Sequence, residues 1–207
     1  MKTNIQKNAI VSAISFLTIL ALVSCQKEQQ LTQPAKNDQA SNLSASIAEA
    51  GKIAQTDYVY WVGLEPFIEG PDKTVAPNGD TIIIEGSGTF TIHTKSVTGN
   101  GEFQHKNAAG TLLASGTWNA LELLSFVSWG SSIDPTLPPS FEAGKAHIRI
   151  HLSPDGGGNG FDAILQISCV LPGAKYPAGF EEGVRVVVSD VINFNDQVHG
   201  QTLFIRQ

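Results

Sequence analysis

Sulfur and positive charge are scarce in this sequence. The 207 residues contain two cysteines, one methionine, and 13 lysine or arginine residues against 19 acidic residues. Two cysteines cannot build the disulfide framework on which many small secreted domains depend. An acidic chain without a basic stripe argues against binding to nucleic acid, and against electrostatic attraction to anionic lipid, because both require clustered lysine and arginine.

Recognisable catalytic motifs are also missing. The sequence contains no Gly-x-Ser-x-Gly, no phosphate-binding Walker loop and no His-Glu-x-x-His. Serine, histidine and acidic residues are scattered without the context that would define a catalytic site. We therefore assign no catalytic residue, no cofactor and no metal ion, and the sequence gives an enzyme no support.

The one long apolar run lies at the N-terminus. Residues 9–23 are almost wholly apolar and follow a short start that contains Lys2 and Lys7 but no acid. This run is too short for a membrane span, which needs about 20 residues. A basic start, a short apolar core and small residues at the exit are typical of a secretory signal.

The exit of this segment reads Leu22-Val23-Ser24-Cys25. It resembles the lipobox of bacterial lipoproteins, in which the cysteine sulfur receives a diacylglyceryl group. The signal is then cut off ahead of the cysteine, and the new amino group is often acylated, as with palmitate. The resemblance implies a signal peptide at 1–24 and a lipid-bearing Cys25. It also implies sorting to the outer membrane, because Gln26 stands where an inner-membrane protein would carry Asp. Exposure to the periplasm or at the cell surface stays open.

The remainder divides into a tether and one domain. Residues 25–55 are rich in Gln, Asn, Ser, Ala and Lys and contain no aromatic residue, so they cannot bury enough surface to offset their ordering entropy. In 56–207, short runs rich in Val, Ile, Thr and Phe alternate with Gly, Pro and Asn clusters, which is typical of an all-β domain. The expected strands are 58–64, 81–85, 89–97, 102–106, 111–118, 122–129, 146–152, 161–171, 184–193 and 202–205.

We predict a single antiparallel β-barrel of about eight strands, with a β-sandwich as the alternative. The barrel is comparable, by architectural analogy only, to lipocalins and allene-oxide cyclases. Glycines punctuate 86–118, which favours a tightly curved sheet. The repeated glycine-rich segments GSGTF, GNGEF and SGTW within 80–130 resemble those of uncharacterised small secreted bacterial β-domains. The segment Thr98-Gly99-Asn100-Gly101 predicts a type I′ hairpin turn.

Aromatic residues suggest a ligand cavity inside this domain. They gather around the first and middle strands, and a Pro-rich connection at 130–144 follows Trp129 and could cap a barrel mouth. His105 alternates in phase with Phe103 and is expected to be a hydrogen-bonded core or lumen residue. The row of His147, Arg149 and His151 is either a solvated face or a lumen-facing row in which Arg149 meets a carboxylate ligand. The predicted ligand-binding residues are Trp118, Trp129, Tyr60, His105 and Arg149.

Four other candidate sites have simpler interpretations. His147 and His151 are about 13 Å apart along a strand, which is too far for one metal ion. The glycine-rich segment at 155–162 lacks the alternating acids of a calcium loop and predicts a long hairpin loop. Glu181 and Glu182 would face opposite ways on a strand, so a solvated turn is expected there. Cys169 shares a strand face with apolar residues and is expected to be buried.

Three functional hypotheses remain. The first is a membrane-anchored envelope lipoprotein whose barrel binds a small, partly apolar molecule. The second is a structural or interaction module with a filled core that docks on an envelope protein partner. The third is a cyclase-like or isomerase-like enzyme that works by positioning its substrate. An open apolar cavity favours the first or third, and a filled core favours the second.

The lipobox leads to a direct test of the anchor. We expect cells fed a labelled fatty acid to incorporate the label into this protein, because two or more acyl chains hold a protein stably on a membrane. The Cys25→Ala variant should lose the label and leave the membrane fraction. Cys169→Ala removes the other cysteine and serves as the control that keeps both properties. Equal membrane retention of wild type and Cys25→Ala would contradict the assignment.

Overall fold

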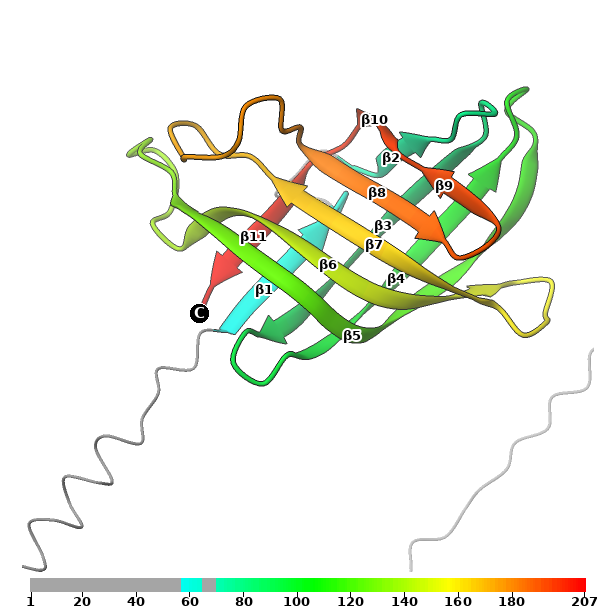
Figure 1. The fold of residues 1–207 in the computed structure, drawn as a ribbon, viewed down its shortest axis with the longest axis horizontal. Helices are drawn as coiled ribbons and strands as arrows, with labels where there is room; N and C mark the ends of the chain where they lie inside the picture. The colour runs from blue at the N-terminus through cyan, green and yellow to red at the C-terminus, as the bar shows by residue number, and fades with distance from the viewer. Residues whose placement is uncertain (1–56, 65–69) are drawn as a thin grey trace, which may run out of the picture. The chain divides into compact units, whose positions relative to one another are not determined.

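The computed structural model describes residues 57–64 and 70–207, where the chain is all-β (Figure 1). The predicted signal at 1–24 and tether at 25–55 lie outside the described residues. Every strand pairing is antiparallel, which confirms the expected fold class, with more strands than the eight expected. The described residues contain no helix, and so none that is long and apolar enough to cross a membrane. The strands are β1 (Asp57–Val62), β2 (Asp72–Val75), β3 (Thr81–Thr91), β4 (Ser96–Lys106), β5 (Leu112–Ser131), β6 (Phe141–Pro154), β7 (Phe161–Cys169), β8 (Gly183–Val188), β9 (Ile192–Phe194), β10 (Asp196–His199) and β11 (Thr202–Arg206).

The strand pairings close on themselves. The long strands β3, β4, β5 and β6 pair in sequence order. The free edge of β3 is shared by β1 and β2, and the free edge of β6 is shared by β11 and β7. Because β1 also pairs with β11, the strands β1, β3, β4, β5, β6 and β11 form a ring. Strand β10 pairs with the other edge of β2, β8 pairs with the other edge of β7, and β9 pairs with β8. Strands β2 and β8 also pack against each other.

Alternation of side chains along the strands fills the interior. In β6 the small and aliphatic residues Ala146, Ile148, Ile150 and Leu152 are buried, while His147, Arg149 and His151 between them face outward. This is the period of two expected of a strand with one face on a core. Tyr58, Phe90, Phe126 and Phe204 pack together inside the ring, with ring centroids 4.7–6.0 Å apart.

Two glycine pairs across β3 and β4 make room for large aromatic side chains. Gly86 lies opposite Gly101, and Gly88 lies opposite Gly99. A Cβ atom on Gly86 or Gly101 would lie 2.6 Å from an atom of the Trp118 indole, and one on Gly88 would lie 2.5 Å from the Tyr60 hydroxyl. We call these four residues the glycine window. The Trp118 Nε1–H donates to the Glu85 carbonyl at 2.9 Å, and the Tyr60 hydroxyl donates to the Thr98 carbonyl at 3.1 Å.

The glycine window overturns the predicted hairpin turn at 98–101. Those residues lie in the middle of β4, and the chain instead turns at residues 92–95, where the Lys95 amide meets the Ile92 carbonyl. Lys95 has a φ of 55°. The prediction was wrong because the Asn100-Gly101 dipeptide continues β4 instead of reversing the chain. Here Gly99 and Gly101 serve the close approach of Tyr60 and Trp118.

We expect Gly88→Ala to destabilise the domain strongly. The new methyl group would overlap both the Tyr60 hydroxyl and the Thr98 carbonyl oxygen, which is backbone and cannot turn away. Overpacking a core usually costs about 1–3 kcal/mol, and the backbone clash places this variant at or above the upper end. Urea denaturation followed by tryptophan fluorescence would measure the change.

Gly156→Ala is the matched control, because a Cβ at Gly156 has no atom within 4 Å. Its free energy of unfolding should stay within about 0.5 kcal/mol of wild type. If Gly88→Ala is as stable as Gly156→Ala, the glycine window is not a packing requirement.

Candidate ligand-binding site

An apolar cavity of about 140 Å³ opens at the end of the sheet where β3 and β5 begin and β4 and β6 end. Its lining comes from seven strands or their connections, so no single segment of sequence encodes it. Nearly all of the lining side chains are aliphatic or aromatic. The residues are Ile82, Phe103, His105, Ala114, Leu152, Pro154, Phe161, Val188, Val191, Ile192 and Phe194. We call this cavity the His105 pocket.

His105 is the only residue of this lining whose side chain carries a nitrogen or oxygen atom. Its Nε2 lies 3.2 Å from the Asp80 carboxylate, and both side chains are half-buried. The imidazole also meets the Phe194 ring edge to face at 5.4 Å between centroids. His105 is therefore the hydrogen-bonded residue at the edge of the interior that its phase with Phe103 predicted.

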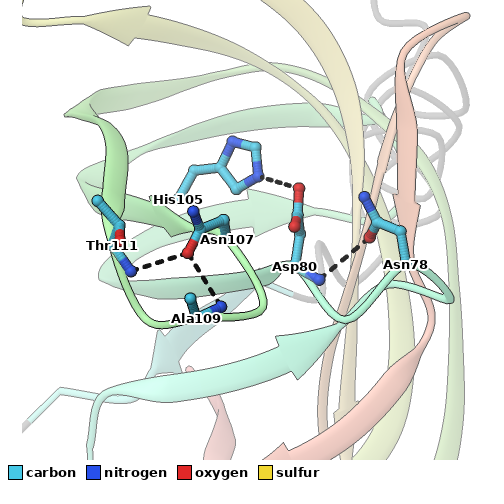
Figure 2. Close-up of polar contacts among 6 residues, drawn as sticks. All are labelled: Asn78, Asp80, His105, Asn107, Ala109 and Thr111. Atoms are coloured by element: carbon cyan, nitrogen blue, oxygen red, sulfur yellow. Dashed lines mark hydrogen bonds and ion pairs between the residues drawn. The ribbon is translucent and has the colours of Figure 1, made fainter.

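Two tight turns hold this histidine and its partner in place (Figure 2). In the β2–β3 turn, the Asn78 side-chain oxygen accepts from the Asp80 amide at 3.1 Å. In the β4–β5 turn, the Asn107 side-chain oxygen accepts from the amides of Ala109 at 3.0 Å and Thr111 at 2.9 Å. Such side-chain turns fix the local backbone without help from other strands. The rim of the His105 pocket is thus set by the sequence of the turns themselves.

The two turns also touch each other. A Cβ on Gly79, whose φ is +86°, would lie 2.8 Å from the Ala108 Cβ. Gly79 thus meets two requirements, a left-handed backbone conformation and close contact with the neighbouring turn. This contact places Asp80 beside His105, although the two residues are 25 positions apart.

The structure does not bring the five predicted ligand-binding residues together. Tyr60 and Trp118 are fully buried against the glycine window and do not line the His105 pocket. Arg149 lies on the outer face, where it pairs with Glu122 at 2.5 Å and its side chain is 49% exposed. Of the five, only His105 lines the pocket.

Trp129 and the Pro-rich connection lie elsewhere. The Trp129 ring meets the Phe180 ring edge to face, with 4.4 Å between ring centroids, and the Lys145 ammonium lies over the Phe180 ring, 5.6 Å from its centre. The connection at 132–140 packs against the segment after β7, where the Ser132 hydroxyl donates to the Pro172 carbonyl at 2.8 Å. Trp129 therefore packs against the β7–β8 connection and does not line the His105 pocket.

The histidines of β6 belong to cross-strand polar rows. Ser125, His147 and Gln166 lie opposite one another on β5, β6 and β7, with 2.9 Å from Ser125 Oγ to His147 Nδ1 and 3.1 Å from His147 Nε2 to Gln166 Oε1. His151 similarly meets Asp162 at 2.7 Å. These pairs follow directly from the strand register, as expected of polar residues on one sheet face.

The prediction of a solvated turn at 181–182 is wrong for Glu182, whose carboxylate is hydrogen-bonded inside the domain. Thr202 donates to Glu182 Oε1 through its amide at 2.7 Å and its hydroxyl at 3.0 Å, and the Val170 amide donates to Oε2. Burial raises the pKa of Glu182 to about 7, against these donors, which lower it. The turn folds back against β11, so one acid faces inward while Glu181 stays exposed near Arg185.

This turn also borders a second cavity, of about 220 Å³. Its lining mixes apolar side chains with Gln201 and with Glu182 and Thr202, which hydrogen-bond each other. The residues are Leu137, Phe141, Val170, Leu171, Glu182, Gln201, Thr202 and Leu203. Leu137 belongs to the Pro-rich connection, so that connection covers this cavity and not the His105 pocket.

Asp72 is the most unusual buried group. It faces inward from β2 and is fully buried, and no side chain in the described part of the chain hydrogen-bonds either carboxylate oxygen. Burial raises its pKa to about 8 and the nearby Glu182 charge adds to the shift, while the Gly63 backbone amide lowers the pKa. The raised pKa favours the protonated carboxyl, which avoids the cost of an unpaired buried charge.

Cys169 is fully buried, as its apolar neighbours predicted, and it is a free cysteine. Burial and the Glu182 charge raise the pKa of its thiol well above the usual range. A buried thiol with a raised pKa is a poor nucleophile, because the thiolate is the reactive form. The interpretation of Cys169 as a small core residue is confirmed.

Within residues 57–64 and 70–207, no group of three or more His, Cys, Asp and Glu side chains is arranged to hold a metal ion. No protein-family model matches this chain, and no curated protein or solved structure matches it. The His105 pocket is then the feature on which a function can be argued.

Most of the residues that line this pocket could not be recognised as neighbours from the sequence. Asp80 was missed because it follows a turn, Pro77-Asn78-Gly79, that marks a chain reversal and nothing chemical. The Asn-Gly-Asp combination ahead of an apolar strand could have placed Asp80 at a strand end. Its pairing with His105 depends on the β3–β4 register, in which Ile82 lies opposite His105.

We expect Asp72→Asn to stabilise the protein at neutral pH. Between the unfolded pKa of about 3.9 and the folded pKa of about 8, the unfolded chain releases a proton that the folded chain keeps. The free energy of unfolding therefore falls as the pH rises through this window. Asp72→Asn removes this term and should be up to about 4 kcal/mol more stable at pH 7, with a shallower pH slope.

Urea denaturation at pH 5, 6.5 and 8 would check this expectation. Asp196→Asn, at an exposed position on the neighbouring strand β10, is the control and should keep the wild-type slope. A wild-type pH slope in Asp72→Asn would show that Asp72 is ionised in the folded protein.

Proposed function

We propose that this chain is a lipid-anchored envelope lipoprotein of the outer membrane whose β domain binds a small, largely apolar molecule in the His105 pocket. The lipobox at Leu22-Val23-Ser24-Cys25 supports the anchor. The observation that carries the binding function is the pocket itself, a cavity open to solvent and lined by apolar side chains around one histidine. Ligand sites in proteins commonly combine an apolar lining with a few polar groups.

The size of the pocket sets the size of the ligand. An engineered apolar cavity of about 150 Å³ stays free of water and binds benzene. The His105 pocket, at about 140 Å³, matches a single ring or a short branched chain. Phe161 is 49% exposed and Val191 62% exposed at its opening, so part of a longer ligand could extend over apolar surface.

The exposed apolar residues near the opening favour one second candidate. Leu112 and Leu113, at the start of β5, are each more than half exposed. Together with Phe161 and Val191 they could form part of a docking surface for an envelope protein. Exposed apolar side chains that form a contiguous patch often mark interaction sites. This alternative predicts that filling the pocket leaves partner binding intact.

Filling the pocket tests the binding function. In Ala114→Phe the larger side chain, placed at a lining position, should occupy the space that the ligand needs. Ala109→Phe, at the exposed tip of the adjacent β4–β5 turn, is the matched control. The processed chain from residue 25 on, with Cys25→Ala so that it carries no lipid, retains every described strand.

We expect benzene or toluene to shift the amide signals of β3, β4 and β9 in NMR spectra of the wild-type domain and of Ala109→Phe. In Ala114→Phe the affinity should fall at least tenfold. Absence of any ligand-dependent shift in the wild type at millimolar benzene would rule out the His105 pocket as an apolar binding site.

A further inference from the structure

The chemistry of the ligand can be narrowed further from His105. Because the other ten lining side chains carry only carbon and hydrogen, any polar group of a ligand that meets a side chain inside the pocket must meet His105. Its hydrogen-bonding character therefore decides which polar group is accepted. A buried polar group left without a partner costs about 1–3 kcal/mol, so the match matters.

Asp80 fixes that character. A carboxylate has no proton to give, so in the 3.2 Å contact the imidazole Nε2–H donates to Asp80 Oδ2. In the neutral imidazole the other nitrogen, Nδ1, then carries a lone pair and can only accept. Asp80 is the hydrogen-bond partner that the structure gives His105 among the described residues. The ligand group that complements Nδ1 is an O–H or N–H donor.

Charge excludes the ionised alternatives. The lining contains no lysine or arginine, and the carboxylate of Asp80 lies directly behind His105. A ligand carboxylate would lose its hydration, and the pocket offers it no unpaired cation in return. An ammonium group would have to leave water for an apolar cavity with a single acceptor. Burying an unpaired charge in this way is far more costly than burying a hydroxyl.

We infer that the His105 pocket selects a neutral, ring-sized molecule that carries one hydrogen-bond donor, the chemical class of phenol, over both the bare hydrocarbon and the carboxylate. This inference rests on the proposed binding function and assigns His105 as the specificity-determining residue, with Asp80 as the residue that sets its tautomer. The Phe194 ring also packs edge to face against the imidazole, with 5.4 Å between ring centroids.

The test compares benzene, phenol and benzoate as ligands of the processed chain, by NMR titration at pH 7.5. In the wild type we expect phenol to bind more tightly than benzene, and benzoate to bind least. In His105→Phe, which keeps a ring but removes both nitrogens, the phenol-to-benzene affinity ratio should fall by about tenfold, the value of one hydrogen bond of about 1.4 kcal/mol. His199→Phe, at an exposed position outside the lining, should keep the wild-type ratio.

Asp80→Asn supplies a second variant with the imidazole intact. Because Asn can donate as well as accept, it no longer enforces the Nε2–H tautomer, so the phenol-to-benzene affinity ratio should fall below the wild-type value. Because this ratio takes benzene as its internal reference, its change separates tautomer control from a general loss of affinity.

The outcomes are distinguishable. If none of the three ligands binds the wild type, the proposed binding function itself fails. If benzene binds but phenol binds no better, or if the phenol-to-benzene ratio is the same in wild type and His105→Phe, the pocket is an apolar site and the inference is overturned. If benzoate binds best, His105 acts as a cation and the inference is likewise overturned.

Discussion

Close packing of two aromatic side chains against bare backbone organises this domain. Tyr60 reaches the glycine window from β1, and Trp118 reaches it from β5, so strands on both sides of the β3–β4 pair are held to it. Each aromatic polar atom also hydrogen-bonds a strand carbonyl of this pair. Buried Tyr and Trp need such partners for their O–H and N–H groups. The ring of strands can close here because the four glycines of the glycine window lack Cβ atoms. The side chains of Tyr60 and Trp118 can therefore pack directly against the backbone of β3 and β4.

The same packing explains which parts of the fold the sequence could predict. Strands with apolar residues at every second position, such as 146–152 and 161–171, were located correctly because their inward faces are apolar. Strand β2 was missed because its inward residues are Asp72 and Thr74, which leave no apolar alternation to detect. The expected strands 81–85 and 89–97 were separated at glycines that in fact continue β3. Sequence alone does not distinguish a glycine that bends the chain from one that makes room for a distant tryptophan.

The candidate site shows the same division between local and long-range information. The position of His105 in the interior followed from its phase with Phe103, since both lie on one strand. The aromatic residues expected to share the cavity with it were displaced by tertiary packing, two of them into the core and Trp129 against Phe180. Phe194 could not be foreseen as a neighbour of His105, because β9 lies far along the chain from β4. Asp80 could not be foreseen because only the register of β3 and β4 places it beside His105.

The two ends of the described domain are joined by a hydrogen bond, from the Gln207 amide to the Asp57 carbonyl at 2.9 Å. Asp57 lies opposite Thr91, at the end of β3 remote from Ile82 and the His105 pocket. Adjacent termini are the feature that lets a domain be inserted into another protein or circularly permuted. This domain could therefore be grafted into a surface loop of a host protein through two adjacent junctions, with the His105 pocket at the end of β3 remote from them. Such an insertion would need no linker across the sheet.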